Sequence, residues 1–219
     1  QWLANSGADF YNGVATQSAR FDSGSSAYLS RTPSSAGNRR TWTWSGWIKF
    51  SKVNNWTTLF SSGSDSNNQT RLKFDDNGGR LFFDNEVSGS TNQRFYTNRF
   101  FRDPSAWYNI VLAIDTTQGT DTNRVKFFVN GTQITSFAQS DYPIANLEYN
   151  LNTTNPVEIG RQIGASSYWD GYMADVNFID GLALTPTSFG ELKNGVWIPI
   201  NTSGLTFGTN GFRLQFDQV

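Results

Sequence analysis

Apolar and polar residues alternate along much of this chain, a pattern typical of β-strands with one buried face. Residues 41–50 read TWTWSGWIKF, so even positions are apolar or glycine and most odd positions are polar. Trp47 is the exception, an aromatic ring on the nominally wet side. Residues 107–115, WYNIVLAID, are apolar on both parities and predict a central strand covered on both sides.

Short polar turns separate these stretches. Asn130-Gly131 lies between two alternating segments, and this dipeptide is the strongest short-range signal for a hairpin. A second hairpin is predicted where TRLKF and RLFFD flank DDNGG at residues 75–79. The pattern therefore predicts about a dozen strands joined by polar loops, which is typical of a two-sheet sandwich.

Helical periodicity is nearly absent. No segment of a dozen residues shows a clean 3.6-residue period, and one short turn is expected where Thr185 caps, Pro186 begins and Gly190 ends it. Residues 1–18 alternate poorly and predict an arm that docks on a neighbouring copy, followed by one domain over residues 19–219.

Composition narrows the chemistry. The 219 residues include no cysteine and no histidine, which excludes disulfides, thiolate metal sites and histidine-based nucleophile systems. The formal net charge of -1 gives no overall field to attract a polyanion or an anionic membrane, so neither nucleic-acid binding nor membrane insertion is expected.

The segment YWDGYMADVNFIDGLALTP, residues 168–186, concentrates rings and aspartates. Parity assigns Tyr172, Ala174, Val176 and Phe178 to the buried face of a strand, and Met173, Asp175, Asn177 and Ile179 to the other face. Asp170 and Asp180 fall at its two ends, where aspartate commonly satisfies turn amides. Trp169 and Asp170 remain candidates for contact at the rim.

Catalysis is not expected. Glycoside hydrolysis needs two carboxylates about 5–9.5 Å apart. Glutamates are scattered, and Asp170 and Asp180 would lie about 33 Å apart along a continuous strand. We therefore predict a protein that is not an enzyme.

Calcium is the only reasonable metal because oxygen ligands alone are plentiful, and no cofactor is required. Candidate ligands lie in three polar loops, GSDSNNQ, DDNGG and DTTQGTDTN, and the residues favoured are Asp65, Asn67, Asp115, Asp121 and Asn123. None matches the EF-hand spacing, and the alternative is that these residues simply form turns.

Glycan binding would use exposed ring faces beside polar groups. Rings at loop or strand-end positions are Trp56, Tyr96, Tyr142 and Trp169, the last with Asp170. The alternative is that such rings seal the ends of a sandwich.

Four segments carry a resemblance to a known family: ARFDSGSSAYLSRTPSSAGNRRTWTWSGWIKF, FRDPSAWYNIVLAIDTTQGTDTNRVKFFVNGTQI, EIGR and YWDGYMADVNFIDGLALTPTSFGE. In this order they resemble a laminin G-like domain of the concanavalin A-like lectin/glucanase superfamily, as found in structural proteins of tailed, particularly marine, bacteriophages. The resemblance covers about residues 18 to 217. It implies an all-β antiparallel jelly-roll sandwich of twelve to fourteen strands, with at most one or two helical turns, and a recognition module that in some members holds calcium at its rim.

Two functions follow from the resemblance. The first is a virion surface module, in a tail fibre, spike or capsid decoration, that adheres to host or environmental polysaccharide. Such a module is expected to form a homo-oligomer and to contact other virion proteins. The second is a purely structural virion protein that cements or spaces the particle without binding glycans. A polysaccharide lyase or hydrolase is a third and weaker alternative.

Overall fold

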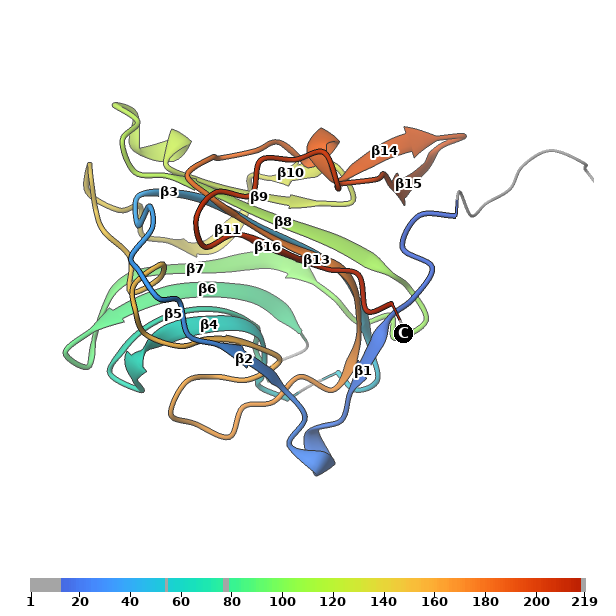
Figure 1. The fold of residues 1–219 in the computed structure, drawn as a ribbon, viewed down its shortest axis with the longest axis horizontal. Coiled ribbons are helices and arrows are strands. Elements are labelled where there is room, and N and C mark those ends of the chain that lie inside the picture. Colours follow the sequence, from blue (N-terminus) through green and yellow to red (C-terminus); the bar gives the residue numbers. More distant parts are fainter. Residues whose placement is uncertain (1–12, 54, 77–78, 218–219) are drawn as a thin grey trace, which may run out of the picture.

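The computed structural model describes residues 13–53, 55–76 and 79–217. These residues form two antiparallel seven-stranded sheets and a separate hairpin (Figure 1). Sheet A has the order β1-β13-β3-β8-β9-β10, and β16 also pairs with β13. Its strands are β1 (Ala19–Phe21), β3 (Thr41–Phe50), β8 (Tyr108–Asp115), β9 (Val125–Val129), β10 (Thr132–Ile134), β13 (Gly171–Asp180) and β16 (Phe212–Leu214).

Sheet B has the order β11-β7-β6-β5-β4-β12-β2. Its strands are β2 (Leu29–Arg31), β4 (Thr57–Asp65), β5 (Asn68–Phe74), β6 (Arg80–Val87), β7 (Ser90–Phe100), β11 (Phe137–Ser140) and β12 (Val157–Ile159). The separate hairpin pairs β14 (Gly190–Lys193) with β15 (Val196–Pro199).

The predicted two-sheet antiparallel sandwich is confirmed. Its two sheets hold fourteen strands in the described residues, within the expected range, and the β14–β15 hairpin adds two outside them. Residues 13–53, 55–76 and 79–217 contain three single turns of 3-10 helix, one more than expected: η1 (Ser23–Ser25), η2 (Asp121–Asn123) and η3 (Pro186–Ser188). None of the helical segments in the described part of the chain could span a membrane.

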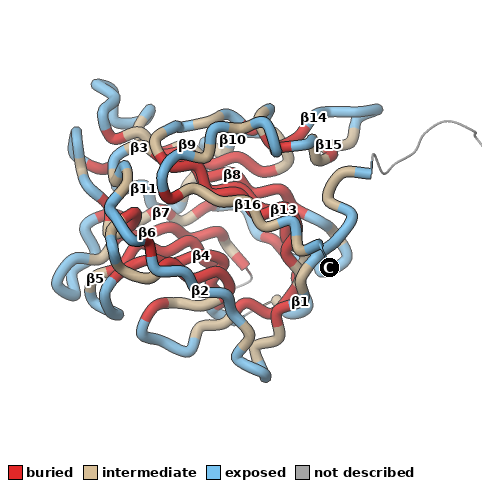
Figure 2. Tube along the Cα trace, in the orientation of Figure 1, coloured by how far each residue is buried: buried red, intermediate tan, exposed pale blue. Residues whose placement is uncertain are grey.

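Two apolar clusters hold the layers together, and buried residues follow the paired strands (Figure 2). Ile110, Leu112 and Ile114 of β8 point into the main core between the sheets. Val111 and Ala113 point the other way, into a second cluster that the C-terminal segment closes with residues such as Phe189 and Leu205. The prediction that this strand is covered on both sides is therefore confirmed.

Both predicted hairpins form. Asn130 and Gly131 have φ of 48° and 77° between β9 and β10, the left-handed pair that a two-residue hairpin turn requires. Strands β5 and β6 pair on either side of the DDNGG segment. The turn after Thr185 also forms, beginning at Pro186 and ending at Ser188, although the Thr185 side chain does not cap it.

The expected parity of β13 is wrong in its first half. Pairing with β3 shifts between Ala174 and Asn177, and Asp175 has a φ of 42°, so one extra residue bulges from the strand. The bulge reverses the alternation before it. Met173 therefore joins Val176 in the main core, whereas Tyr172 lies half-buried outside that core.

Two other expectations concern the wet side and the N-terminus. Trp47 is buried rather than wet, although it belongs to neither apolar cluster. Most of the predicted arm, residues 1–12, lies outside the described residues, and β1 starts at Ala19 by pairing with β13. Docking of this segment on a second copy stays a prediction.

Candidate functional site

The outer side of sheet B carries rings and cations. Along β5, Leu72 and Phe74 point into the core, so by the period of two Arg71 and Lys73 point outward. Phe82 of β6 is buried but belongs to neither apolar cluster, because it faces this outer side. We call the following residues the ring-and-cation face: Trp56, Lys73, Arg80, Phe82, Arg94, Tyr96 and Phe100.

Strand register aligns these side chains into rows. Lys73 lies opposite Phe82, and Phe82 lies opposite Tyr96, so the three form one row across β5, β6 and β7. A second row runs from Arg71 through Asp84 to Arg94. Directly opposed residues on one face are close enough for their side chains to interact. The face therefore combines a row of rings and a lysine with a row of charges.

Three rings meet around Phe82. The Trp56 ring lies edge-on to it with centroids 5.8 Å apart, and the Tyr96 ring lies edge-on from the other side at 4.4 Å. Phe82 is only 2% exposed, whereas Trp56 is 39% exposed. The structure thus brings two of the predicted ring residues, Trp56 and Tyr96, onto one surface, and Trp56 offers the accessible ring.

Lys73 is enclosed by rings rather than by polar groups. Its Nζ lies 4.5 Å from the Trp56 centroid and 4.6 Å from the Phe82 centroid. The residue is 8% exposed, and no hydrogen bond or ion pair to another described residue engages its ammonium. Burial, together with the positive charge of Arg71, lowers the pKa of Lys73 to about 8.

The carboxylates on and beside this face are already paired. Arg71 holds both Asp84 and Glu86: its Nε donates to Asp84 Oδ1 at 2.7 Å, and its Nη2 contacts both side chains. At the margins, Arg80 pairs with Asp75 at 3.0 Å and Arg161 with Glu158 at 2.7 Å. The negative charges of this surface are therefore neutralised by arginines.

Within the ring-and-cation face, Arg94 is the second cation that no carboxylate of the described residues pairs with. Its guanidinium lies 5.4 Å from the Phe82 centroid and donates from Nη2 to Thr91 Oγ1 at 2.9 Å. The Nε of Arg94 is buried and has no hydrogen-bond acceptor in the described structure. Two cations thus flank one ring without a neutralising anion.

The remaining predicted ring residues do not belong to this surface. Trp169 is fully buried in the core against Phe50, with ring centroids 4.9 Å apart, so its expected contact at the rim is wrong. Tyr142 is half-buried and packs on Phe95 at 5.1 Å. Both rings act as seals of the sandwich, the alternative that large apolar area favours.

Asp170 is also buried, which corrects its expected exposure at the rim. Its Oδ2 accepts a hydrogen bond from Ser23 Oγ at 2.8 Å and lies 3.5 Å from Lys52 Nζ. Asp170 therefore ties the turn after β1 to the start of β13.

The candidate calcium ligands satisfy turns. Asp65 accepts from the Asn67 amide at 2.7 Å, which leaves both residues within the β4–β5 turn. Asp115 accepts from Thr117 and Gln118. Asp121 and Asn123 form the η2 turn, where Asp121 accepts from the Thr122 amide. Within the described residues, no group of three or more acidic side chains could hold a metal. The structure supports the turn interpretation.

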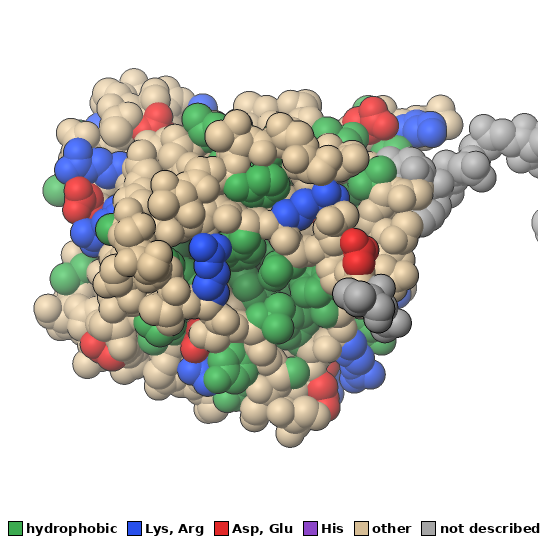
Figure 3. Space-filling model, viewed as in Figure 1, with side chains coloured by type: hydrophobic (Ala, Val, Ile, Leu, Met, Phe, Trp, Pro, Cys, Tyr) green, Lys and Arg blue, Asp and Glu red, His purple; other side chains and the backbone are tan. Residues whose placement is uncertain are grey.

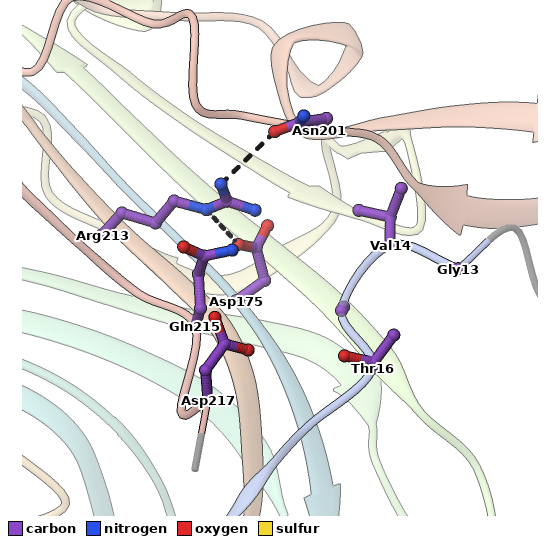
Figure 4. A pocket seen from close by; sticks show the side chains of 9 residues that line it. Gly13, Val14, Thr16, Asp175, Asn201, Arg213, Gln215 and Asp217 are labelled. Atoms are coloured by element: carbon purple, nitrogen blue, oxygen red, sulfur yellow. Dashed lines mark hydrogen bonds and ion pairs between the residues drawn. The ribbon is translucent and has the colours of Figure 1, made fainter. Parts of the chain in front are cut away.

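A hollow of about 230 Å³ lies between the segment 13–16 and the C-terminal residues (Figure 4). Asp175, on the bulge of β13, accepts from Arg213 Nε at 2.7 Å, and Arg213 also donates to Asn201 at 3.3 Å. Asp175 and Arg213 therefore satisfy each other, and Asp217 is the lining charge without an ion pair in the described structure.

A second hollow, of about 190 Å³, is lined by Asp115, Asn123 and Lys126 among others. The lysine among its lining residues disfavours a cation there. On another side of the molecule, apolar side chains gather between β16 and β2 (Figure 3), where Phe212, Leu214 and Phe216 pack against the main core. Neither feature shows unsatisfied chemistry comparable with that around Phe82.

Lys73, Phe82 and Arg94 were missed by sequence reasoning. The signal was present as alternation: TRLKF, RLFFD and QRFY each place a charged or ring residue between core residues. Their proximity depends on the register of three strands, which local sequence does not specify.

Known structures with this architecture include three of interest. The heptameric SAP-like pentraxin of Limulus polyphemus shares 20% identity with a TM-score of 0.51, covering 78% of this chain and 75% of that chain. Mouse laminin alpha1 domains LG4-5 share 11% sequence identity with a TM-score of 0.54, covering 93% of this chain and 48% of that chain. Tailspike protein 2 of the Escherichia coli O157:H7 bacteriophage CAB120 shares 15% sequence identity with a TM-score of 0.51, covering 78% of this chain and 23% of that chain. This chain thus spans about half of the laminin structure and a quarter of the tailspike.

These likenesses show the fold, a two-sheet antiparallel β-sandwich. A family model described as the concanavalin A-like lectin/glucanases superfamily, of the laminin G type, matches residues 22–188, and the chain belongs to this family. A search of curated protein sequences gave no significant match. The family predicted from the four sequence segments is confirmed.

Proposed function

We propose that this protein is a non-catalytic carbohydrate-binding module and that the ring-and-cation face is its binding surface. The observation that carries the proposal is the exposed Trp56 ring beside the Phe82–Tyr96 pair, with two cations lacking carboxylate partners. A flat ring can pack against the apolar face of a sugar, and neighbouring charged donors can bind its oxygens.

The charges on this surface support binding over hydrolysis. Asp84 and Glu86 project from the same face of β6 as neighbours two residues apart, so they are the nearest approach to a carboxylate pair on sheet B. Arg71 contacts both of them, and Asp84 is fully buried. A general acid or a nucleophile must reach the substrate, which a carboxylate enclosed by its own arginine does not do.

The setting that we propose is the surface of a tailed bacteriophage, in a tail fibre, spike or capsid decoration. The segments quoted above resemble domains of phage structural proteins, and the fold occurs within a tailspike protein. In this proposal the chain forms a homo-oligomer, and this oligomer assembles with other virion proteins. Repetition on a particle would convert weak binding at single sites into firm adhesion to host or environmental polysaccharide.

The test is a glycan array probed with the multimerised protein and with Trp56→Ala. A sugar that covers about 50 Å² of the ring contributes about 1.3 kcal/mol, so the variant should bind about tenfold more weakly. Trp107→Ala is the matched control, since Trp107 is 37% exposed and no ring contact ties it to this face. That variant should bind like the unaltered protein.

Three outcomes would count against the proposal. Absence of binding to any glycan, together with particles that fall apart without the protein, would favour the purely structural role. Equal loss of binding in the Trp56 and Trp107 variants would place the site elsewhere. Release of reducing ends from host polysaccharide would show that the protein is an enzyme.

A further inference from the structure

Lys73 and Arg94 share one ring. Both cationic groups lie within 5.4 Å of the Phe82 centroid, and Lys73 also lies 4.5 Å from the Trp56 centroid. They extend from β5 and β7, the two neighbours of β6, so the sheet register fixes their separation. The two positive charges therefore form a preorganised pair on either side of Phe82.

Neither cation has a partner of opposite charge among the described residues. A buried ammonium group normally pairs with a carboxylate, because removing it from water is costly. Asp84 and Glu86 lie in the adjacent row, but both are held by Arg71. The cation–π contacts with Trp56 and Phe82 compensate in part, and no described residue accepts a hydrogen bond from the ammonium.

This pair of cations has hydrogen-bond donors that no described residue uses. The Lys73 ammonium can donate three hydrogen bonds and makes none to the described protein, and the buried Arg94 Nε is a further donor without an acceptor. An anionic oxygen is the acceptor that satisfies such donors best, because charge-assisted hydrogen bonds are about twice as strong as neutral ones. Beside it, the exposed Trp56 ring offers the apolar contact that a sugar ring needs.

We propose that the ring-and-cation face selects an acidic sugar, one that bears a carboxylate or a sulfate ester, whose anionic group binds Lys73 and Arg94 without a bridging metal. This proposal rests on the carbohydrate-binding role proposed above. The ring of the sugar packs on Trp56, and the two cations bind its anionic group. A methyl ester or a desulfated analogue of the same sugar lacks the group that they recognise.

The test compares matched probes on the full chain. Oligogalacturonate and its methyl ester have the same backbone and differ in charge, and a sulfated galactan and its desulfated form provide the second pair. Unaltered protein should bind the charged member of at least one pair more than tenfold tighter. The two pairs distinguish a carboxylate from a sulfate ester as the source of the charge.

Lys73→Met keeps the length of the side chain and removes its charge. It should weaken binding of the charged probe about ten- to hundredfold and leave the neutral probe unchanged. Lys73→Arg should retain most of the preference. The matched control is Lys126→Met on the outer side of sheet A, which should change neither. A cooperative urea-unfolding transition shows that each variant is folded.

The outcomes separate this proposal from the one on which it rests. Binding of charged and neutral probes with equal affinity overturns the acidic preference while carbohydrate binding stands. Loss of charged-probe binding in EDTA overturns recognition by lysine and arginine alone. Equal affinity of Lys73→Met and the unaltered protein for the charged probe assigns the lysine to packing only and overturns its role. Absence of binding to all four probes overturns the acidic preference, and absence of binding to every glycan on the array overturns both proposals.

Discussion

Removing the charge of Lys73 should stabilise the fold. Burial lowers the pKa of this side chain from 10.5 to about 8, a shift of roughly 2.5 units that corresponds to a penalty of about 3 kcal/mol for the charged form. The contacts with Trp56 and Phe82 return about 0.5–2 kcal/mol of this penalty. Methionine also packs well against rings, so the free energy of unfolding of Lys73→Met should be about 1–3 kcal/mol higher than that of the unaltered protein at pH 7.

The dependence on pH gives the sharper test. Below pH 8 the lysine is charged in the folded and unfolded states, so the native protein bears the full penalty. Between pH 8 and 10.5 the folded state has released a proton that the unfolded state still holds, so rising pH stabilises the native protein. Above pH 10.5 the side chain is neutral in both states, and the advantage of the variant should shrink to its packing contribution.

The charged groups that surround Lys73 set the reference for this experiment. They are Arg71 on β5, Asp84 and Glu86 on β6, and Arg94 on β7. Because these groups are present in both proteins, the difference between the two stability curves isolates Lys73. Urea unfolding followed by tryptophan fluorescence at pH 7, 8, 9 and 10.5 measures it, and Lys126→Met serves as control. Parallel curves for native protein and Lys73→Met would refute the reasoning.

Two further predictions concern stability, both measured by urea unfolding. Arg71→Met should lower the free energy of unfolding by about 3–5 kcal/mol, because it leaves the buried Asp84 unpaired. Arg40→Met, at the exposed pair with Glu148, should lower it by under about 1 kcal/mol. Similar losses in the two variants would contradict the burial argument. Gly131→Ala should cost about 1–3 kcal/mol, since its φ is 77° and a Cβ there would lie 2.5 Å from the Trp197 ring, whereas Gly119→Ala, with open space around it, should be nearly neutral; a neutral Gly131→Ala would show that the turn adjusts freely.

Local alternation was sufficient to predict the strands that build the sandwich. The even positions of residues 41–50 became core residues of β3, and the two apolar faces of β8 met two different clusters. Asn130-Gly131 formed its hairpin because the left-handed backbone that it favours is a property of those two residues alone. These features depend on interactions between near neighbours in the chain.

Features that depend on pairing between distant strands could not be predicted in this way. The bulge at Asp175 arises from the fit of β13 to β3 and reverses the parity of Met173. Trp169 was expected at a rim but is enclosed by Phe50 and Phe74, which belong to different sheets. The environment of Lys73 likewise requires Trp56 and Phe82, which only the folded chain places beside it.

The second apolar cluster has a consequence for the extent of the folding unit. The family model ends at residue 188, but Phe189, Leu205 and Phe207 lie beyond it and pack with Val111 of the central strand. Strand β16 adds a further partner for β13 at Leu214. The autonomous unit is therefore longer than the stretch shared with the family, and a piece of the chain cut at the family boundary would leave one side of sheet A uncovered.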